Sequence, residues 1–96
     1  MNYCKTITAA AVANSAETLT ETEVLYLAQK VAFEINTRRA AVALEQGDTS
    51  LHFATHRAAG CAKYGIGCFG RTLSKPRKAK LGKMGKAIAA AAALTA

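Results

Sequence analysis

The chain has 96 residues, a length that fits one domain (1–96) with a modest hydrophobic core and excludes a second, catalytic domain. The first 48 residues hold all six acids and four Lys or Arg, whereas the last 48 hold nine Lys or Arg and no acid. The two halves therefore carry net charges of −2 and +9. An acid-free half that repels itself predicts an anionic partner.

Alanine is abundant and aromatic residues are few, which favours close helix packing and predicts an all-α domain. Three cysteines, Cys4, Cys61 and Cys68, are an odd number, and no segment has the pattern of a secretory leader, so a cytoplasmic protein is expected. The apolar stretch Ala87–Ala96 has ten residues, about half of the ~20 that span a bilayer. No transmembrane segment is predicted.

Residues 1–14 predict a weakly ordered arm or a short helix. A long helix at about 21–46 follows, because Thr20 and Glu23 form a capping box and Gly47 is the expected residue just beyond the C-terminus. Its apolar residues recur at helical spacing.

The long helix carries apolar residues on two faces. One face contains Val24, Leu25, Ala28, Val31, Ala32 and Ile35, and the other Tyr26, Phe33, Ala40 and Leu44. We expect burial on both sides within this chain. Alternatively, one of the two faces is buried against a second copy of the chain, as in a homodimer, or against a target protein. Arg39 falls inside the first face, so it either extends past the core or pairs with a partner's acid.

A second helix is expected at about 50–63, capped by Asp48 or Thr49. The glycines that follow predict a flexible basic connector at 65–75. Ser74 and Pro76 then begin a third helix at about 76–94.

The third helix is predicted to be amphipathic and basic. Leu81, Met84, Ile88 and Ala92 line one side, Lys83 and Lys86 point away from it, and Lys80 lies at the border. Gly82 and Gly85 each cost about 1 kcal/mol relative to Ala inside a helix, so the segment is expected to need a packing partner.

The glycine-rich segment matches the residue patterns of two nucleotide-binding motifs but not the secondary structure that each motif requires. Gly65-x-Gly67-x-x-Gly70 lacks the preceding strand, the following helix start and the downstream acid of a dinucleotide site. The interleaved aromatics of 63–69 would stack RNA bases only on a sheet, which an all-α chain does not supply. A linker with Tyr64 and Phe69 as candidate stacking residues is the simpler interpretation.

Neither a metal site nor an enzyme is expected. His52 and His56 share a helix face, and a zinc site with Cys61 and Cys68 would require the helix to break at Gly60, so solvated or anion-facing histidines are the better interpretation. The acids occupy capping and solvent positions, and a Cys–His nucleophile would have no substrate pocket. We predict no cofactor and no catalysis.

The predicted binding residues are mainly cations. Seven lie between residues 71 and 86. On the second helix, Lys63 is expected on the same face as His52 and His56, and Arg57 on the neighbouring face with Phe53 and Tyr64. The full set is Arg71, Lys75, Arg77, Lys78, Lys80, Lys83, Lys86, Arg57, Lys63, Tyr64 and Phe69. The acids are expected to cap and solvate the long helix, which leaves the cationic run without internal partners.

Three functions compete. The first is a nucleic-acid-associated protein that holds DNA or RNA mainly through phosphate. The second is a small regulator or inhibitor, of the kind that phage and plasmid genomes encode, that docks its basic helix on a larger acidic protein. The third is a membrane-active cationic peptide precursor. Charge favours the first narrowly over the second.

Overall fold

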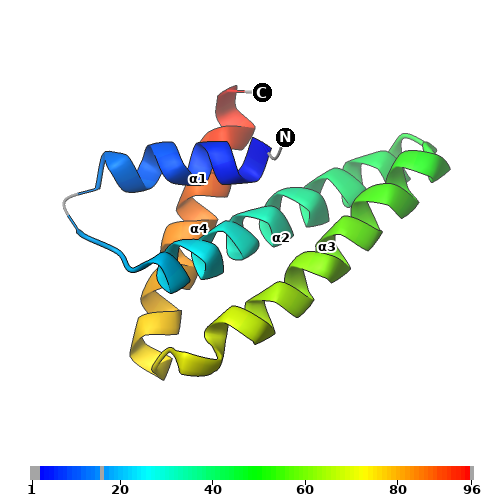
Figure 1. Ribbon diagram of the computed structural model, residues 1–96. Coiled ribbons are helices and arrows are strands. Elements are labelled where there is room, and N and C mark those ends of the chain that lie inside the picture. Colours follow the sequence, from blue (N-terminus) through cyan, green and yellow to red (C-terminus); the bar gives the residue numbers. More distant parts are fainter. Residues whose placement is uncertain (1–2, 16, 96) are drawn as a thin grey trace.

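The computed structural model describes residues 3–15 and 17–95, and within them it is helical with no strand, which confirms the all-α prediction (Figure 1). The elements are α1 (Tyr3–Ala13), α2 (Glu21–Glu45), α3 (Thr49–Phe69), a 3-10 turn η1 (Gly70–Thr72) and α4 (Lys75–Thr95). Over the described residues, no helix has both the length and the apolar character needed to cross a bilayer.

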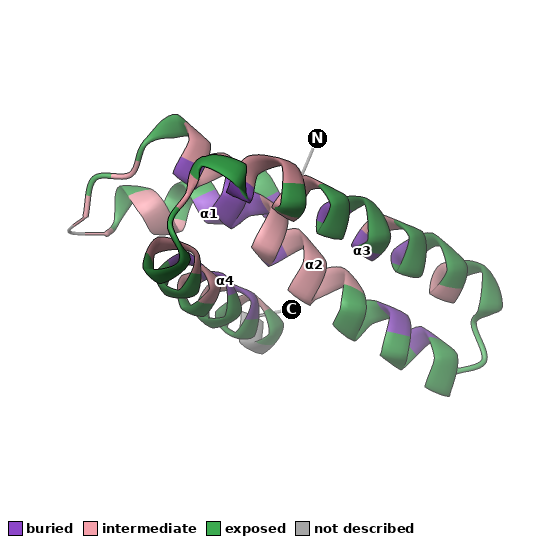
Figure 2. Cartoon of the chain, turned by 90° about the horizontal axis from the view of Figure 1, so that it is seen from below, coloured by how far each residue is buried: buried purple, intermediate pink, exposed green. Residues whose placement is uncertain are grey.

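The long helix α2 is the centre of the fold, because α1, α3 and α4 all pack against it. α2 and α3 form an antiparallel hairpin, and α4 crosses α2 at a steep angle (Figure 1). α3 and α4 lie on different sides of α2 and scarcely touch each other (Figure 2).

Local hydrogen bonds fix both ends of the α2–α3 hairpin as predicted. Thr20 Oγ1 accepts from the Glu23 amide at 3.2 Å, and Glu23 Oε1 accepts from the Thr20 amide at 2.9 Å, which completes the capping box. Gly47 has a φ of +73°, the left-handed conformation that glycine adopts without strain. Asp48 then caps α3 by accepting from the Leu51 amide at 3.0 Å.

The core surrounds the first half of α2. Leu27 and Val31 are fully buried there, together with Leu81 of α4. Tyr26 and Ala28, on either side of Leu27, are also buried, so this half of α2 is covered on more than one side. The expectation of burial on both faces is confirmed for this half.

The second half of α2 is covered on one side only. Ala40 and Ala43 are buried, whereas Val42 and Leu44 are 49% and 65% exposed. Leu44 was expected in the second buried face, but α3 covers only part of that face at this end of the hairpin.

The segment 1–14 contains a helix, α1, which buries Cys4 and Thr8. The Thr8 hydroxyl donates to the Cys4 carbonyl at 2.6 Å, so this polar side chain is satisfied inside the core. Residues 1 and 2 of the predicted arm lie outside the described residues.

α3 continues to Phe69, well beyond its predicted end at about residue 63, so the predicted connector at 65–75 is helical as far as Phe69. Packing explains the difference, because a Cβ atom on Gly65 would lie 2.8 Å from the Gln29 side chain and one on Gly70 would lie 3.1 Å from the Tyr26 ring. Two glycines of the Gly-x-Gly-x-x-Gly pattern therefore allow α3 and η1 to lie close against α2.

Candidate nucleic-acid or partner interface

The outward side of α4 carries a row of exposed cations. Leu81, Gly85 and Ala89 are buried on a different side of the helix. Lys75, Lys83 and Lys86 are exposed, and at 100° per residue they fall in one sector of the helix. We call these three lysines the α4 basic face.

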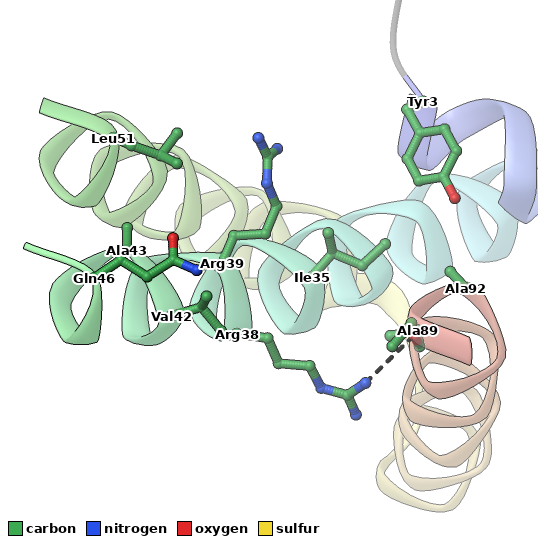
Figure 3. A pocket seen from close by; sticks show the side chains of 11 residues that line it. Tyr3, Ile35, Arg38, Arg39, Val42, Ala43, Gln46, Leu51, Ala89 and Ala92 are labelled. Carbon is green, nitrogen blue, oxygen red and sulfur yellow. Dashed lines mark hydrogen bonds between the residues drawn. The ribbon is translucent and has the colours of Figure 1, made fainter. Parts of the chain in front are cut away.

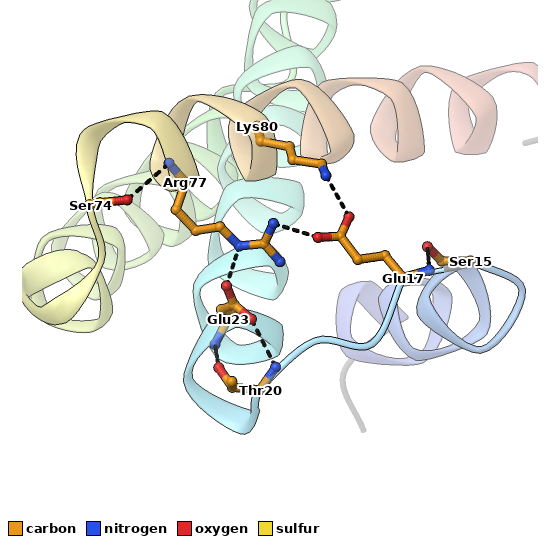
Figure 4. Close-up of polar contacts among 7 residues, drawn as sticks. All are labelled: Ser15, Glu17, Thr20, Glu23, Ser74, Arg77 and Lys80. Carbon is orange, nitrogen blue, oxygen red and sulfur yellow. Dashed lines mark hydrogen bonds and ion pairs between the residues drawn. The ribbon is translucent and has the colours of Figure 1, made fainter.

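Two of the predicted cations are used inside the fold (Figure 4). Arg77 lies between two carboxylates: its Nη1 is 2.5 Å from Glu17 Oε1, and its Nε donates to Glu23 Oε2. Lys80 Nζ is 2.8 Å from Glu17 Oε2. The expectation that the acids only cap and solvate the long helix is therefore wrong for Glu17 and Glu23.

The physical reason is the packing of α4 across the start of α2. This crossing brings the residues just before α2 and the first turn of α2 against the first turns of α4, a relation that the periodicity of each helix does not show. Glu23 thus has two roles, since one oxygen completes the capping box and the other accepts from Arg77.

The ion pairs shift the pKa values of Glu17, Glu23 and Arg77. The hydrogen bond from Arg77, followed by the one from the Thr20 amide, lowers the pKa of Glu23 to about 2. Hydrogen bonds from Lys80 and Arg77 lower the pKa of Glu17, and the two carboxylates raise the pKa of Arg77 above its ordinary value. Arg77 is therefore held as a charged link between α2 and α4.

Five of the seven cations between residues 71 and 86 form no ion pair with any described residue. They are the α4 basic face together with Arg71 and Lys78. Arg71 is exposed on η1, and Lys78 is half-buried because its aliphatic chain lies over Gly70. These five remain available for phosphate or carboxylate groups.

The outward side of α3 forms a second surface. Phe53 and Tyr64 are 63% and 76% exposed, and Arg57 is exposed between them in the same sector of the helix. We call these three residues the α3 aromatic face. Lys63 is exposed on the neighbouring side of α3, which carries His52 and His56. Phe69 is half-buried in another sector, so the two predicted stacking residues Tyr64 and Phe69 do not share a face.

The structure separates these two surfaces. Gln29 of α2 faces α3 and Tyr26 faces Gly70 of η1, whereas Leu27 and Lys30 of α2 face α4. The predicted binding residues therefore do not form one continuous site, because α2 lies between the helices that carry them (Figure 2).

The two histidines differ in their surroundings. His52 is half-buried and its Nδ1 lies 2.9 Å from the Ala40 carbonyl, which can only accept, so this nitrogen carries the proton. His56 is exposed and its ring stacks on His52, with centroids 5.8 Å apart. His52 thus ties α3 to α2, and the expectation of solvated histidines applies to His56 alone.

The candidate metal ligands do not converge. The helix does not break at Gly60, and Cys61 is exposed on a different side of α3 from the imidazoles. Among the described residues, no three His, Cys, Asp or Glu side chains lie close enough together to hold a metal ion.

In comparisons with known proteins, no protein-family model matches the chain, and no curated protein or solved structure is significantly similar to it. The functional argument therefore depends on the residues and geometry described above.

Proposed function

We propose that the chain is a small basic nucleic-acid-associated protein that binds DNA or RNA mainly through phosphate contacts. The observation that supports this most directly is the α4 basic face with Arg71 and Lys78, five cations without an ion-pair partner among the described residues. Clustered Lys and Arg on one side of a helix release counterions from nucleic acid when they contact phosphates.

The fold supports this use of α4. Arg77 and Lys80 hold the first turns of the helix to Glu17 and Glu23, while Leu81 is buried against α2. The α4 basic face is therefore presented on a helix with a fixed orientation, so that phosphate binding does not have to order a flexible tail.

The salt dependence of binding tests this proposal. Five phosphate contacts predict a log–log slope of about −4.5 on duplex DNA, which is roughly a 500-fold loss of affinity between 50 and 200 mM salt. Fluorescence anisotropy with labelled duplex and single-stranded oligonucleotides measures this slope. Affinity that scarcely changes with salt would refute phosphate binding.

Paired charge variants locate the contact surface. Lys83→Gln/Lys86→Gln and Arg57→Gln/Lys63→Gln each remove two exposed cations, but from different helices. We expect the first pair to reduce the magnitude of the duplex slope by about 2 and the second to have a much smaller effect. Equal effects would mean that net charge alone attracts the nucleic acid and that α4 is not the contact surface.

The alternative, a small regulator or inhibitor of the phage or plasmid type that docks on an acidic protein, is favoured by the α3 aromatic face. Exposed Phe, Tyr and Arg side chains are enriched at the centres of protein interfaces. Purification with nuclease treatment distinguishes the two functions, because one co-purifying acidic protein in stoichiometric amount would favour the regulator.

All three cysteines are free, which fits our proposal that the protein acts in the reducing cytoplasm.

A further inference from the structure

A half-open cavity of about 560 Å³ lies where the second half of α2 meets the start of α1, the start of α3 and the end of α4 (Figure 3). Its walls are mainly apolar and include Ile35, Val42, Leu51 and Ala89, while Gln46, Arg38 and Arg39 are its polar lining residues. A cavity of this size and composition is in the range of small-molecule binding sites.

A second hollow of about 410 Å³ continues this cavity along the surface between α1 and α4. It is lined by Ile7, Ala11 and Ile88, and it shares Tyr3 and Ala92 with the first cavity. Apart from the Tyr3 hydroxyl, its side chains are apolar. Together the two hollows form a long apolar groove, which we call the α1–α4 groove.

Two arginines, Arg38 and Arg39, line the first cavity, and Figure 3 shows that their side chains point in different directions, with only Arg38 directed toward Ala89. Neither forms an ion pair with a described residue. Arg38 Nη1 donates to the Ala89 carbonyl at 3.3 Å, which directs its side chain across the cavity toward α4 (Figure 3). Among the described residues no acid lines either hollow, so the charge of the residues that line the first cavity is positive.

We propose that the α1–α4 groove binds a long-chain fatty acid, with the carboxylate in the first cavity between Arg38 and Arg39 and the acyl chain along the apolar walls. Guanidinium groups bind carboxylates through paired, charge-assisted hydrogen bonds. The continuous apolar surface beyond Tyr3 matches an unbranched chain without further polar groups.

The width of the groove favours an acyl chain over a partner helix. α1 and α4 are in contact with each other, and a helix with its side chains is about 10–12 Å across. A helix would have to separate α1 from α4, whereas a single hydrocarbon chain occupies the existing hollow. This proposal is independent of nucleic-acid binding, because the α4 basic face lines neither hollow.

Calorimetric titration of the full chain with oleate, below its critical micelle concentration, tests the carboxylate end. We expect saturable 1:1 binding, with oleyl alcohol binding at least tenfold more weakly because it lacks the charge. Arg38→Gln/Arg39→Gln should weaken oleate binding by a similar factor. Lys83→Gln/Lys86→Gln, which removes the same charge outside the groove, should leave it unchanged.

A pair of alanine variants tests the path of the acyl chain. Ala92→Leu places a larger side chain where the two hollows meet, whereas Ala90→Leu makes the same change at an exposed position of α4 that lines neither. We expect at least a tenfold loss of oleate affinity for Ala92→Leu and no change for Ala90→Leu. Far-UV circular dichroism checks that both variants fold. If Ala92→Leu does not fold, oleate binding by Arg38→Gln/Arg39→Gln is the deciding measurement.

Three results would overturn the proposal. They are the absence of saturable oleate binding to the unmodified chain, equal binding of oleate and oleyl alcohol, and equal loss in the arginine and lysine variants. Dimerisation that Ala92→Leu abolishes, without any oleate binding, would assign the groove to a second copy of the chain. Each of these results is compatible with salt-dependent nucleic-acid binding, so the two proposals fail separately.

Discussion

Gly85 lies close against α2, and adding one methyl group there probes the crossing of α4 and α2. A Cβ atom on Gly85 would lie 2.9 Å from Lys30 Cβ and 3.7 Å from Leu27 Cδ1. Lys30 Cβ is bonded to the α2 backbone, so it moves only if the helix moves. A Cβ atom on Gly82, one turn earlier, would meet only the flexible end of the Lys30 side chain, at 3.5 Å from Cε.

The two substitutions therefore differ in sign. Replacing an interior helical glycine by alanine stabilises a helix by about 1 kcal/mol, and forcing a methyl group into a packed contact costs about 1–3 kcal/mol. Gly82→Ala should raise the free energy of unfolding by about 1 kcal/mol, whereas Gly85→Ala should leave it unchanged or lower it by up to about 2 kcal/mol. Gly60→Ala, with no atom within 4 Å of the new Cβ, should behave like Gly82→Ala.

Urea and thermal unfolding followed by far-UV circular dichroism measure these differences. For a domain of this size, 1 kcal/mol corresponds to about 4–8 °C in Tm, so Gly82→Ala and Gly85→Ala should differ by at least about 4 °C. If Gly85→Ala were as stable as Gly82→Ala, α4 would not lie this close to α2, and the crossing described here would be incorrect.

Two other tests examine the ion pair and the core. The pKa of Glu23, about 2 in the folded chain against an ordinary 4.5, means that its stabilisation is present above pH 4.5 and is lost as the pH falls toward 2. In Glu23→Gln the midpoint of urea unfolding should therefore depend less on pH between pH 2 and 4.5 than in the unmodified chain. Glu21→Gln, at an exposed position of the same turn, should keep the pH dependence of the unmodified chain. Leu81→Ala should lower the free energy of unfolding by about 2–5 kcal/mol because Leu81 is fully buried, whereas Leu44→Ala, at a 65% exposed position, should change it by less than about 0.5 kcal/mol. Similar losses at the two leucines would contradict the placement of the core.

The features that could be predicted from the sequence are those set by neighbouring residues. The capping box of Thr20 and Glu23, the left-handed Gly47 and the Asp48 cap all involve residues within three positions of each other. The apolar side of α4 was predicted only in part, because Leu81 is buried while Met84, Ile88 and Ala92 are half-buried and the packed side runs through Gly85 and Ala89.

The features that the sequence did not reveal depend on contacts between distant segments. Arg77 pairs with Glu23, 54 residues earlier, and no pattern within either helix indicates that contact. The glycines after residue 63 indicated a break in α3, but close packing of Gly65 against Gln29 offsets their low helix propensity. The side of α2 on which each cation lies likewise depends on how α3 and α4 pack against α2, which no local pattern indicates.

The charge asymmetry of the chain therefore has a structural and a functional part, and salt should separate them. The pairs of Arg77 with Glu17 and Glu23 are partly buried, with side-chain exposures of 23%, 33% and 11%, so ions screen them only partly. The lysines of the α4 basic face are exposed, and any phosphate contacts they make compete with counterions directly. Raising the salt from 50 to 200 mM should thus release nucleic acid while the circular dichroism of the fold stays unchanged. Loss of both together would show that the same charges bind the ligand and hold α4 in place.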